Sequence, residues 1–163
     1  MRIREAVAAD LPAIVAIYND AIPGRLATAD MEPVSVESRR AWFSSHGSVR
    51  YPLWVALEER SVLGWLSLSE FYGRAAYAAT VEASVYVATP AQRRGVATAL
   101  LEYMLADAPE RGVKTLLGFV FAHNEPSLAL FRRFAFERWG VLPRVAVLDG
   151  VRRDLVILGR HLA

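Results

Sequence analysis

Short apolar runs with a two-residue period recur along the chain and predict β-strands, because successive side chains of a strand point to opposite faces of a sheet. The clearest pair is PLWVALE and VLGWLSLSE, which a three-residue polar turn joins as in a β-hairpin, with Gly64 suited to a bulge. Asp149 and Gly150 predict a tight turn between the last two strands. The predicted strands cover residues 3–7, 52–58, 62–70, 80–87, 114–121, 136–148 and 151–158.

Apolar residues spaced three or four apart predict four helices between these strands. Asp10 is a suitable cap for the first helix, with Pro12 in its first turn, and Ser35 and Asn124 are suitable caps for the second and fourth. The third helix covers residues 94–106, a loop covers residues 23–33, and residues 71–79 are a loop or a distorted strand. The order β-α-α-β-β-β-α-β-α-β-β predicts an α/β fold in which a mixed sheet has helices on both faces.

Composition favours one compact domain over residues 1–163, with 54% apolar and 22% charged residues. The 19 basic and 17 acidic residues are interleaved, whereas a nucleic-acid binder gathers its positive charge on one face, so we expect no nucleic-acid partner. The chain has no cysteine, and its three histidines lack metal-ligand spacing, so we expect no metal. No signal core or membrane-length apolar run is present, so we expect a soluble cytoplasmic protein with no membrane partner.

A basic glycine turn, Gln92-Arg93-Arg94-Gly95-Val96-Ala97, lies between a predicted strand and a predicted helix. Unpaired N–H groups and the positive dipole end of a helix attract phosphate, and a glycine allows close approach of the backbone. The turn is neither a P-loop nor a GxGxxG dinucleotide motif. Taken alone, these six residues also fit a plain turn glycine beside a solvated arginine pair.

The pattern Q-x-x-G-x-A, placed between a valine-rich strand and the run ALLEYML, resembles the signature of the GCN5-related N-acetyltransferase superfamily. Asn124, Ser127, Leu130 and Phe131, followed by FAF, are similar to that family's N-x-x-S-x-x-L-Y-x-x-x-G-F segment. The resemblance covers nearly the whole chain, and it implies an N-acetyltransferase fold and acetyl-CoA as co-substrate. The residues that it implies for acetyl-CoA binding are Val85, Tyr86, Val87, Gln92, Arg93, Arg94, Gly95, Val96, Ala97, Thr98, Asn124, Ser127 and Phe131.

Two positions depart from the family pattern. Phe131 stands where the family usually has a tyrosine, and Ala135 stands where it usually has a glycine. That tyrosine is often assigned as the acid that protonates the departing CoA thiolate, and a phenylalanine has no proton to give. The thiolate therefore leaves unprotonated, or water or another residue protonates it. We interpret Phe131 as a core aromatic residue, with a CoA contact left open.

Glu82 is the unexpected residue in the strand TVEASVYV. Alternation places Val81 and Ala83 on a core face and Glu82, Ser84 and Tyr86 on the other. A carboxylate there is either a solvated surface group or a general base that takes a proton from the attacking amine. Partial burial would raise its pKa toward the working range. Neighbouring backbone N–H groups could stabilise an oxyanion.

Four segments, YNDAI, TADMEP, ESRRAWFSSH and AAYAATVEASVYV, look like the phosphinothricin and methionine sulfoximine N-acetyltransferase group. The resemblance implies that Glu82 is the base, that the acceptor is the α-amine of a small amino acid, and that the protein is a homodimer. We expect Arg74, Tyr77 and Thr28 to contact the acceptor, with Arg74 either holding its carboxylate or remaining solvated. Two alternatives stay open, another amine as acceptor (a polyamine, an aminoglycoside or a protein N-terminus) and a non-catalytic acyl-CoA-binding module.

Overall fold

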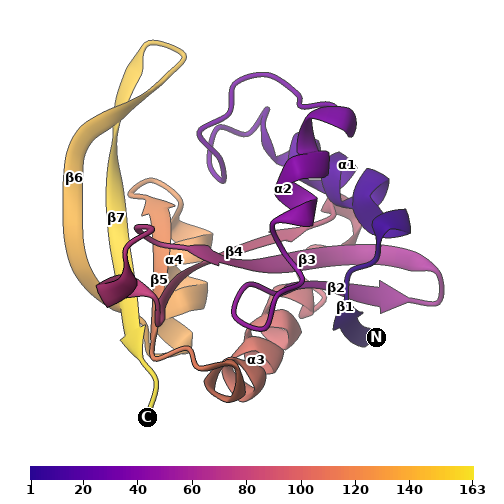
Figure 1. The fold of residues 1–163 in the computed structure, drawn as a ribbon. Helices are drawn as coiled ribbons and strands as arrows, with labels where there is room; N and C mark the ends of the chain where they lie inside the picture. Colours follow the sequence, from indigo (N-terminus) through magenta and orange to yellow (C-terminus); the bar gives the residue numbers. More distant parts are fainter.

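The structure, a computed structural model, describes residues 1–163 as one seven-stranded sheet with the strand order β1-β2-β3-β4-β5-β7-β6 (Figure 1). The strands are β1 (Arg2–Glu5), β2 (Leu53–Glu58), β3 (Ser61–Glu70), β4 (Thr80–Val87), β5 (Thr115–Phe121), β6 (Glu137–Leu148) and β7 (Val151–His161). The helices are α1 (Leu11–Ala21), α2 (Arg40–Ser44), α3 (Val96–Asp107) and α4 (Glu125–Arg133). The predicted mixed sheet and the order of its elements are therefore confirmed.

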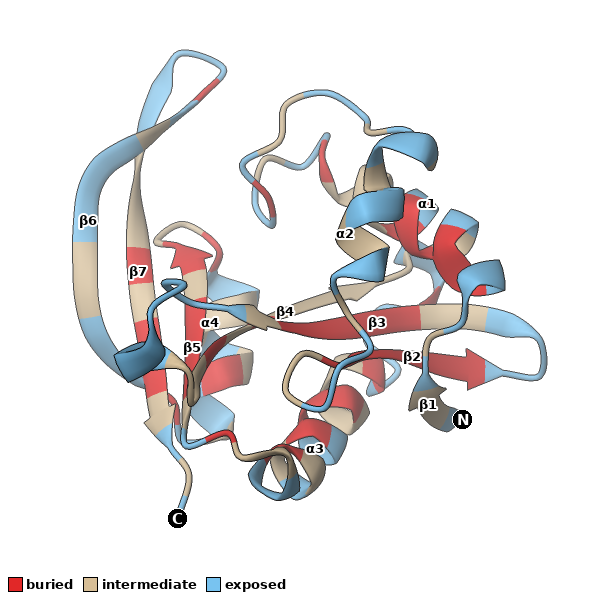
Figure 2. Ribbon diagram, viewed as in Figure 1, coloured by how far each residue is buried: buried red, intermediate tan, exposed pale blue.

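The sheet separates two hydrophobic layers because β2 to β4 alternate their side chains between its faces. Trp54 and Val81 contribute to the layer that α3 and α4 cover, where Leu100, Met104 and Phe131 are buried. Leu53, Val55 and Trp65 point to the other face, where Ile14 and Ile17 of α1 cover them. The central strands are accordingly buried, whereas β6 at the sheet edge is largely exposed (Figure 2).

The pairing of β4 with β5 is the only parallel pairing in the sheet, and it is short. Three register pairs connect the strands, and the last is Glu82 with Leu117. Both strands continue, β4 to Val87 and β5 to Phe121, without further pairing to each other. The central sheet is therefore split open beyond Glu82, with one edge of β4 left free.

The structure differs from the predicted helix cap at Asp10 and agrees with the predicted bulge at Gly64. Asp10 stands at the N-terminus of α1, but its side chain does not cap the helix. Its carboxylate instead accepts hydrogen bonds from Arg4, at 2.7 Å, and from the Val7 N–H, because a 3-10 turn over Ala8–Asp10 precedes the helix. Gly64 adjoins the predicted bulge, and a Cβ there would lie 2.8 Å from the Tyr86 carbonyl oxygen.

The remaining boundaries follow the expectation closely. Asn124 accepts a hydrogen bond from the Ser127 N–H, so this cap is confirmed. Ser35 accepts one from the Ser38 N–H, but it precedes the 3-10 turn Glu37–Arg39 and does not cap α2, which begins at Arg40. Helix α3 begins at Val96, two residues later than predicted, because Gly95 has a left-handed φ of 79°. None of the helices has the length and apolar character needed to cross a bilayer.

Candidate active site

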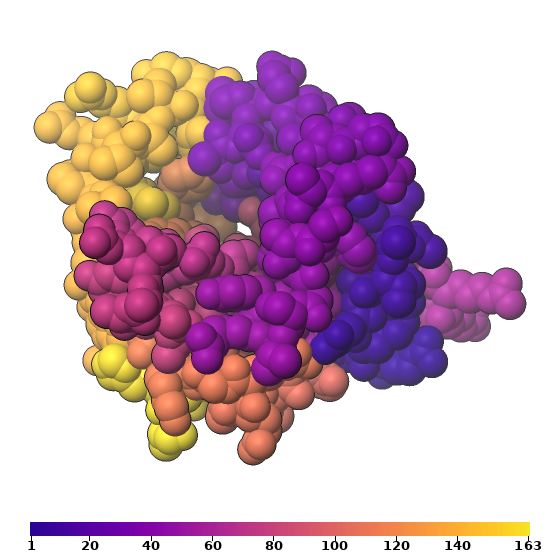
Figure 3. All heavy atoms as spheres, viewed as in Figure 1, coloured from indigo at the N-terminus to yellow at the C-terminus, as the bar shows by residue number.

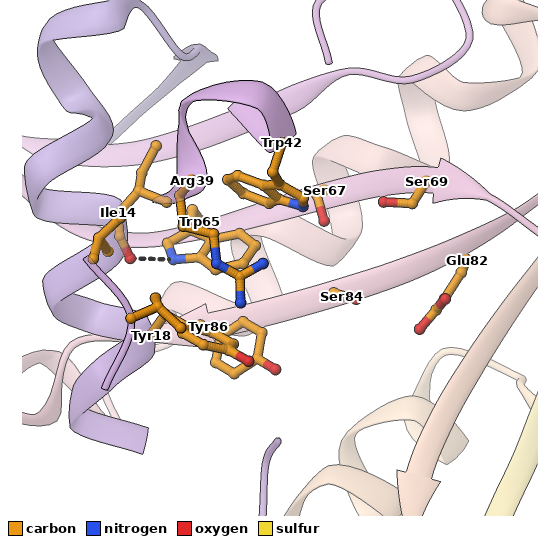
Figure 4. Close-up of a pocket in the computed structure, with 12 residues that line it drawn as sticks. Ile14, Tyr18, Arg39, Trp42, Trp65, Ser67, Ser69, Glu82, Ser84 and Tyr86 are labelled. Carbon is orange, nitrogen blue, oxygen red and sulfur yellow. Dashed lines mark hydrogen bonds between the residues drawn. The ribbon is translucent and has the colours of Figure 1, made fainter. Parts of the chain in front are cut away.

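A cavity of about 250 Å³ opens on the α1 side of the sheet, beside β3 and β4. Its walls combine aromatic rings, three serine hydroxyls and two residues of opposite charge (Figure 4). The charged residues are Arg39 from the turn before α2 and Glu82 from β4. The lining residues are Ile14, Val15, Tyr18, Val34, Arg39, Trp42, Trp65, Ser67, Ser69, Glu82, Ser84 and Tyr86. We call this space the acceptor cavity.

The Glu82 side chain is half-buried, and its carboxylate forms no hydrogen bond or ion pair with another residue. Removal from water disfavours a carboxylate, so burial raises the pKa of Glu82 above its usual value. The same side chain also lines a second cavity, of about 440 Å³, which lies between the separated ends of β4 and β5. Glu82 thus stands at the wall between two spaces with its carboxylate free to react.

The second cavity is closed by segments that lie far apart in sequence. Residues 26–29 form one side, Phe119 and Phe121 of β5 form the base, and Val145 and Leu155 come from β6 and β7. Figure 3 shows the surface hollowed where the purple N-terminal part, the magenta middle part and the yellow C-terminal part of the chain meet. The free edge of β4 lines this hollow from Ala83 to Tyr86.

A third cavity, of about 670 Å³, continues from the same strand edge to the basic glycine turn. Arg93 and Gly95 both have left-handed backbones, with φ of 62° and 79°. No other part of the chain lies within 4 Å of a Cβ built on Gly95, so the turn faces open space in front of the N-terminus of α3. Arg133 of α4 lies on the opposite wall and donates a 2.9 Å hydrogen bond to the Thr98 hydroxyl.

The structure brings nearly all the residues predicted for acetyl-CoA together along these two cavities. They are Val85, Tyr86, Val87, Gln92, Arg93, Gly95, Val96, Ala97, Thr98, Asn124, Ser127 and Phe131. Arg94 is the exception, because its guanidinium forms a 2.6 Å ion pair with Glu58 and does not line either cavity.

Phe131 is both a core residue and a cavity residue. Its side chain is 3% exposed and packs edge-on against Phe136, with 4.9 Å between ring centroids. It also lies under Gly118, where an added Cβ would be 3.5 Å away. One part of the ring still lines the second cavity.

The loop after α1 is held over the cavities by three consecutive backbone carbonyls. The carbonyl of Arg25 lies 2.8 Å from His123 Nε2, and that of Leu26 accepts a 3.2 Å hydrogen bond from the Asn124 amide. The third carbonyl, of Ala27, accepts a 3.0 Å hydrogen bond from the Tyr86 hydroxyl. The loop is therefore a fixed wall of the site, and both polar groups of the buried Asn124 side chain are engaged.

The three residues predicted to contact the acceptor lie in different surroundings. Thr28 is 8% exposed, lines the second cavity and lies 2.6 Å from the Tyr18 hydroxyl. Arg74 is exposed and without an ion pair, and Tyr77 packs edge-on with Phe71 and Tyr72 on the surface. Arg74 and Tyr77 line none of the three cavities, and their contact with an acceptor stays a prediction.

The sequence matches the profile described as "Acetyltransferase (GNAT) family" over residues 11–136, which contain the split strands, the glycine turn and Glu82. The chain belongs to the GNAT acetyltransferase family. It is 47% identical, over all of both chains, to a Bacillus subtilis protein named "Putative phosphinothricin acetyltransferase YwnH". It is 34% identical to the L-methionine sulfoximine/L-methionine sulfone acetyltransferase of Pseudomonas aeruginosa, over 98% of this chain and 94% of that one.

A solved structure of the family shares the fold closely. It is the phosphinothricin acetyltransferase of Sinorhizobium meliloti in complex with acetyl-CoA, which is 31% identical with a TM-score of 0.93. The match covers 99% of this chain and 88% of the S. meliloti chain.

The sequence did not predict several residues that line this acetyltransferase site. Arg39 lies over the rings of Tyr18 and Trp42, 5.0 and 6.0 Å from their centroids, and pairs with Asp30 at 3.0 Å. Trp42 and Trp65 also line the acceptor cavity. The sequence signal for Arg39 and Trp42 was the segment ESRRAWFSSH, which contains both residues.

Proposed function

We propose that this acetyltransferase transfers the acetyl group of acetyl-CoA to the α-amine of a small amino acid, such as methionine sulfoximine, methionine sulfone or phosphinothricin. The observation that carries the proposal is the position of Glu82, a half-buried carboxylate without a partner. It borders both the acceptor cavity and the cavity that leads along β4 toward the glycine turn.

The chemistry assigns one role to Glu82. An amino acid carries an ammonium group at neutral pH, and only the neutral amine has the lone pair that attacks the thioester carbonyl. Glu82 takes the proton, directly or through a water molecule, and burial supports this role by raising its pKa toward neutrality. The attack forms the C–N bond and a tetrahedral oxyanion, whose collapse breaks the C–S bond and releases the CoA thiolate.

The free edge of β4 supports binding of acetyl-CoA. Beyond Glu82 the backbone on the β5 side has no strand partner, so its N–H and C=O groups are available to an extended ligand and to the oxyanion. The turn that ends in Gly95 presents the N-terminus of α3 to the third cavity, which suits a pyrophosphate. Arg93 and Arg133 line the same space and supply positive charge. Acetyl-CoA also occupies the related S. meliloti enzyme.

Charge in the acceptor cavity favours an amino acid over a polyamine. Glu82 suits the amine, and Arg39 is the one cationic side chain on the cavity wall. One guanidinium nitrogen of Arg39 pairs with Asp30, and the other nitrogens form no hydrogen bond. A guanidinium there suits a carboxylate or another anionic oxygen and repels a second ammonium group. The names of the B. subtilis and P. aeruginosa relatives point to the same acceptor class.

A non-catalytic acyl-CoA-binding module is the second candidate, and Phe131 favours it because no tyrosine supplies a proton to the thiolate at that position. The neighbouring Tyr86 hydroxyl donates to the Ala27 carbonyl, and burial raises its pKa, so its proton is held. A thiolate is a fairly stable anion near neutral pH, so the transfer proceeds without such an acid.

We also propose a homodimer that forms through β6. This edge strand has its outer side unpaired and exposes several large apolar side chains, which monomeric proteins seldom gather on one edge. They are Trp139, Leu142, Val145 and Val147, with Val151 beside them at the start of β7. Sedimentation at micromolar concentration should give twice the mass of one chain, and Val147→Lys should shift it to the monomer.

The test of the proposed function is release of free thiol from acetyl-CoA across a panel of amines. The panel pairs each amino acid with its decarboxylated amine and adds a polyamine and an aminoglycoside. Turnover restricted to amino acids supports the proposal. Turnover with the polyamine alone contradicts the acceptor class, and binding of acetyl-CoA without turnover on any amine supports the non-catalytic module.

A further inference from the structure

His46 lies just after α2, within hydrogen-bond distance of a serine that lines the acceptor cavity. Its Nδ1 atom lies 2.8 Å from the Trp42 backbone carbonyl, and its Nε2 atom lies 3.2 Å from the Ser69 hydroxyl. The ring is half-buried and tilts against the Trp42 ring, with 4.8 Å between the centroids. Ser69 itself lines the cavity, as Figure 4 shows.

The contact with the carbonyl determines which ring nitrogen carries the proton. A carbonyl oxygen only accepts hydrogen bonds, so Nδ1 must be the protonated nitrogen. Burial lowers the pKa of His46, so the ring is neutral near neutral pH and Nε2 has only a lone pair. The Ser69 hydroxyl therefore donates its proton to Nε2.

A serine whose proton is engaged in this way presents only lone pairs to its other neighbours. Ser69 is the register partner of Glu82 across β3 and β4, so both side chains project from the same face of the sheet as direct neighbours. Each residue lines the acceptor cavity. This end of the cavity therefore offers hydrogen-bond acceptors, which match an ammonium group or an amine.

We propose that His46 is a positioning residue. It orients the Ser69 hydroxyl so that the Ser69 oxygen accepts a hydrogen bond from the amine of the substrate amino acid, beside Glu82. The inference rests on the proposed function, since it assigns a binding group to the same acceptor. Without His46, the Ser69 hydroxyl is free to turn its proton into the cavity, where it opposes the amine protons. A purely structural role for the imidazole would instead affect folding and leave acceptor binding unchanged.

Steady-state kinetics with methionine sulfone test the pair through four variants. His46→Ala and Ser69→Ala should each raise KM for methionine sulfone about tenfold, the size of one hydrogen bond to a charged group, with kcat within about twofold. The double variant should have the same KM as either single variant, whereas two independently acting residues would raise KM about a hundredfold. His46→Gln, whose amide oxygen can accept from Ser69, should restore most of the affinity. Ser61→Ala, at the exposed opposite end of β3, is the matched control and should leave KM unchanged.

Nitrogen NMR of the imidazole rings provides a second readout that needs no turnover. Only three histidines are present, and His46 should show the Nδ1-protonated neutral form in the wild-type protein. An Nε2-protonated ring, unchanged KM in both single variants, or additive losses in the double variant would overturn the proposal. If the wild-type protein acetylates no amine, the proposed function fails, and the ring form alone decides whether His46 orients Ser69.

Discussion

Glu82 and Leu117 form the last pair shared by β4 and β5, and the two strands separate immediately beyond them. The split places the Glu82 carboxylate at the point where the acceptor cavity and the second cavity meet. An amine that enters from the α1 side and a thioester laid along the free edge of β4 would therefore meet at this carboxylate.

Replacement of Glu82 by Gln should stabilise the protein at neutral pH and not at acidic pH. Burial raises the pKa of Glu82, so the folded state binds its proton more tightly than the unfolded state does. The buried charge therefore costs stability as pH rises from the usual carboxyl pKa through the folded-state value. Calorimetry should show Glu82→Gln melting above wild type at about pH 8, with little difference near pH 4. Equal shifts at both pH values would contradict the assigned burial.

Gly95→Val should weaken acetyl-CoA binding at least tenfold, about 1.4 kcal/mol or more. The φ of 79° disfavours a branched residue, and the added side chain projects into the cavity in front of α3. Gly150→Val is a matched control, because Gly150 has the same φ of 79° and an equally open Cβ position but lies in the β6–β7 turn. Titration calorimetry should give wild-type affinity for that control. An unchanged affinity in Gly95→Val would remove the turn from the binding site.

Arg74→Ala should raise KM strongly for methionine sulfoximine while kcat changes less, as expected when ground-state binding is lost. Arg74 lines none of the described cavities, but it is exposed and has no ion pair in the protein, so its guanidinium is free to hold a carboxylate. The variant should also discriminate less between the amino acid and its decarboxylated amine. Equal losses for the two compounds would transfer the carboxylate contact to Arg39, which lies inside the cavity.

Asn124→Ala should lower the melting temperature by several degrees. The side chain is 6% exposed, caps α4 through the Ser127 N–H and holds the Leu26 carbonyl, so its loss leaves two backbone groups unpaired. Such losses cost about 1–3 kcal/mol each, or roughly 2–4 °C per kcal/mol for a chain of this size. Ser35→Ala removes an exposed hydrogen bond from the Ser38 N–H without a contact to another segment, and it should have the smaller effect. If Ser35→Ala lowered the melting temperature more than Asn124→Ala does, the contact of Asn124 with the Leu26 carbonyl would contribute nothing to stability.

Much of the fold follows from local sequence patterns. The alternation of Val81 and Ala83 with Glu82 and Ser84 predicted which side of β4 is core, and the structure places them on those two faces. The turn at Asp149 and Gly150 was predictable because both residues tolerate the positive φ that they adopt, 52° and 79°. Such signals are short in range, since they depend on side-chain periodicity and on local backbone preference.

The composition of the acceptor cavity could not be predicted in the same way. Arg39, Trp42 and Ser69 meet only because the turn before α2 and the helix itself pack over β3, and no periodicity encodes that packing. Arg93 and Arg94 are equivalent in sequence, yet only Arg93 lines the third cavity, while Arg94 turns to Glu58. The direction of each side chain depends on the left-handed backbone at Arg93, which an arginine rarely adopts.

The pH dependence of turnover in Glu82→Gln tests most directly whether the Glu82 carboxylate is the general base. This variant should bind acetyl-CoA with wild-type affinity and lose roughly two to four decades in kcat at neutral pH, the usual contribution of a general base. The loss should shrink at high pH, where solvent deprotonates the amine. Glu70→Gln, an exposed carboxylate at the end of β3, should keep wild-type turnover. Wild-type turnover of Glu82→Gln at neutral pH would show that the carboxylate is not the base.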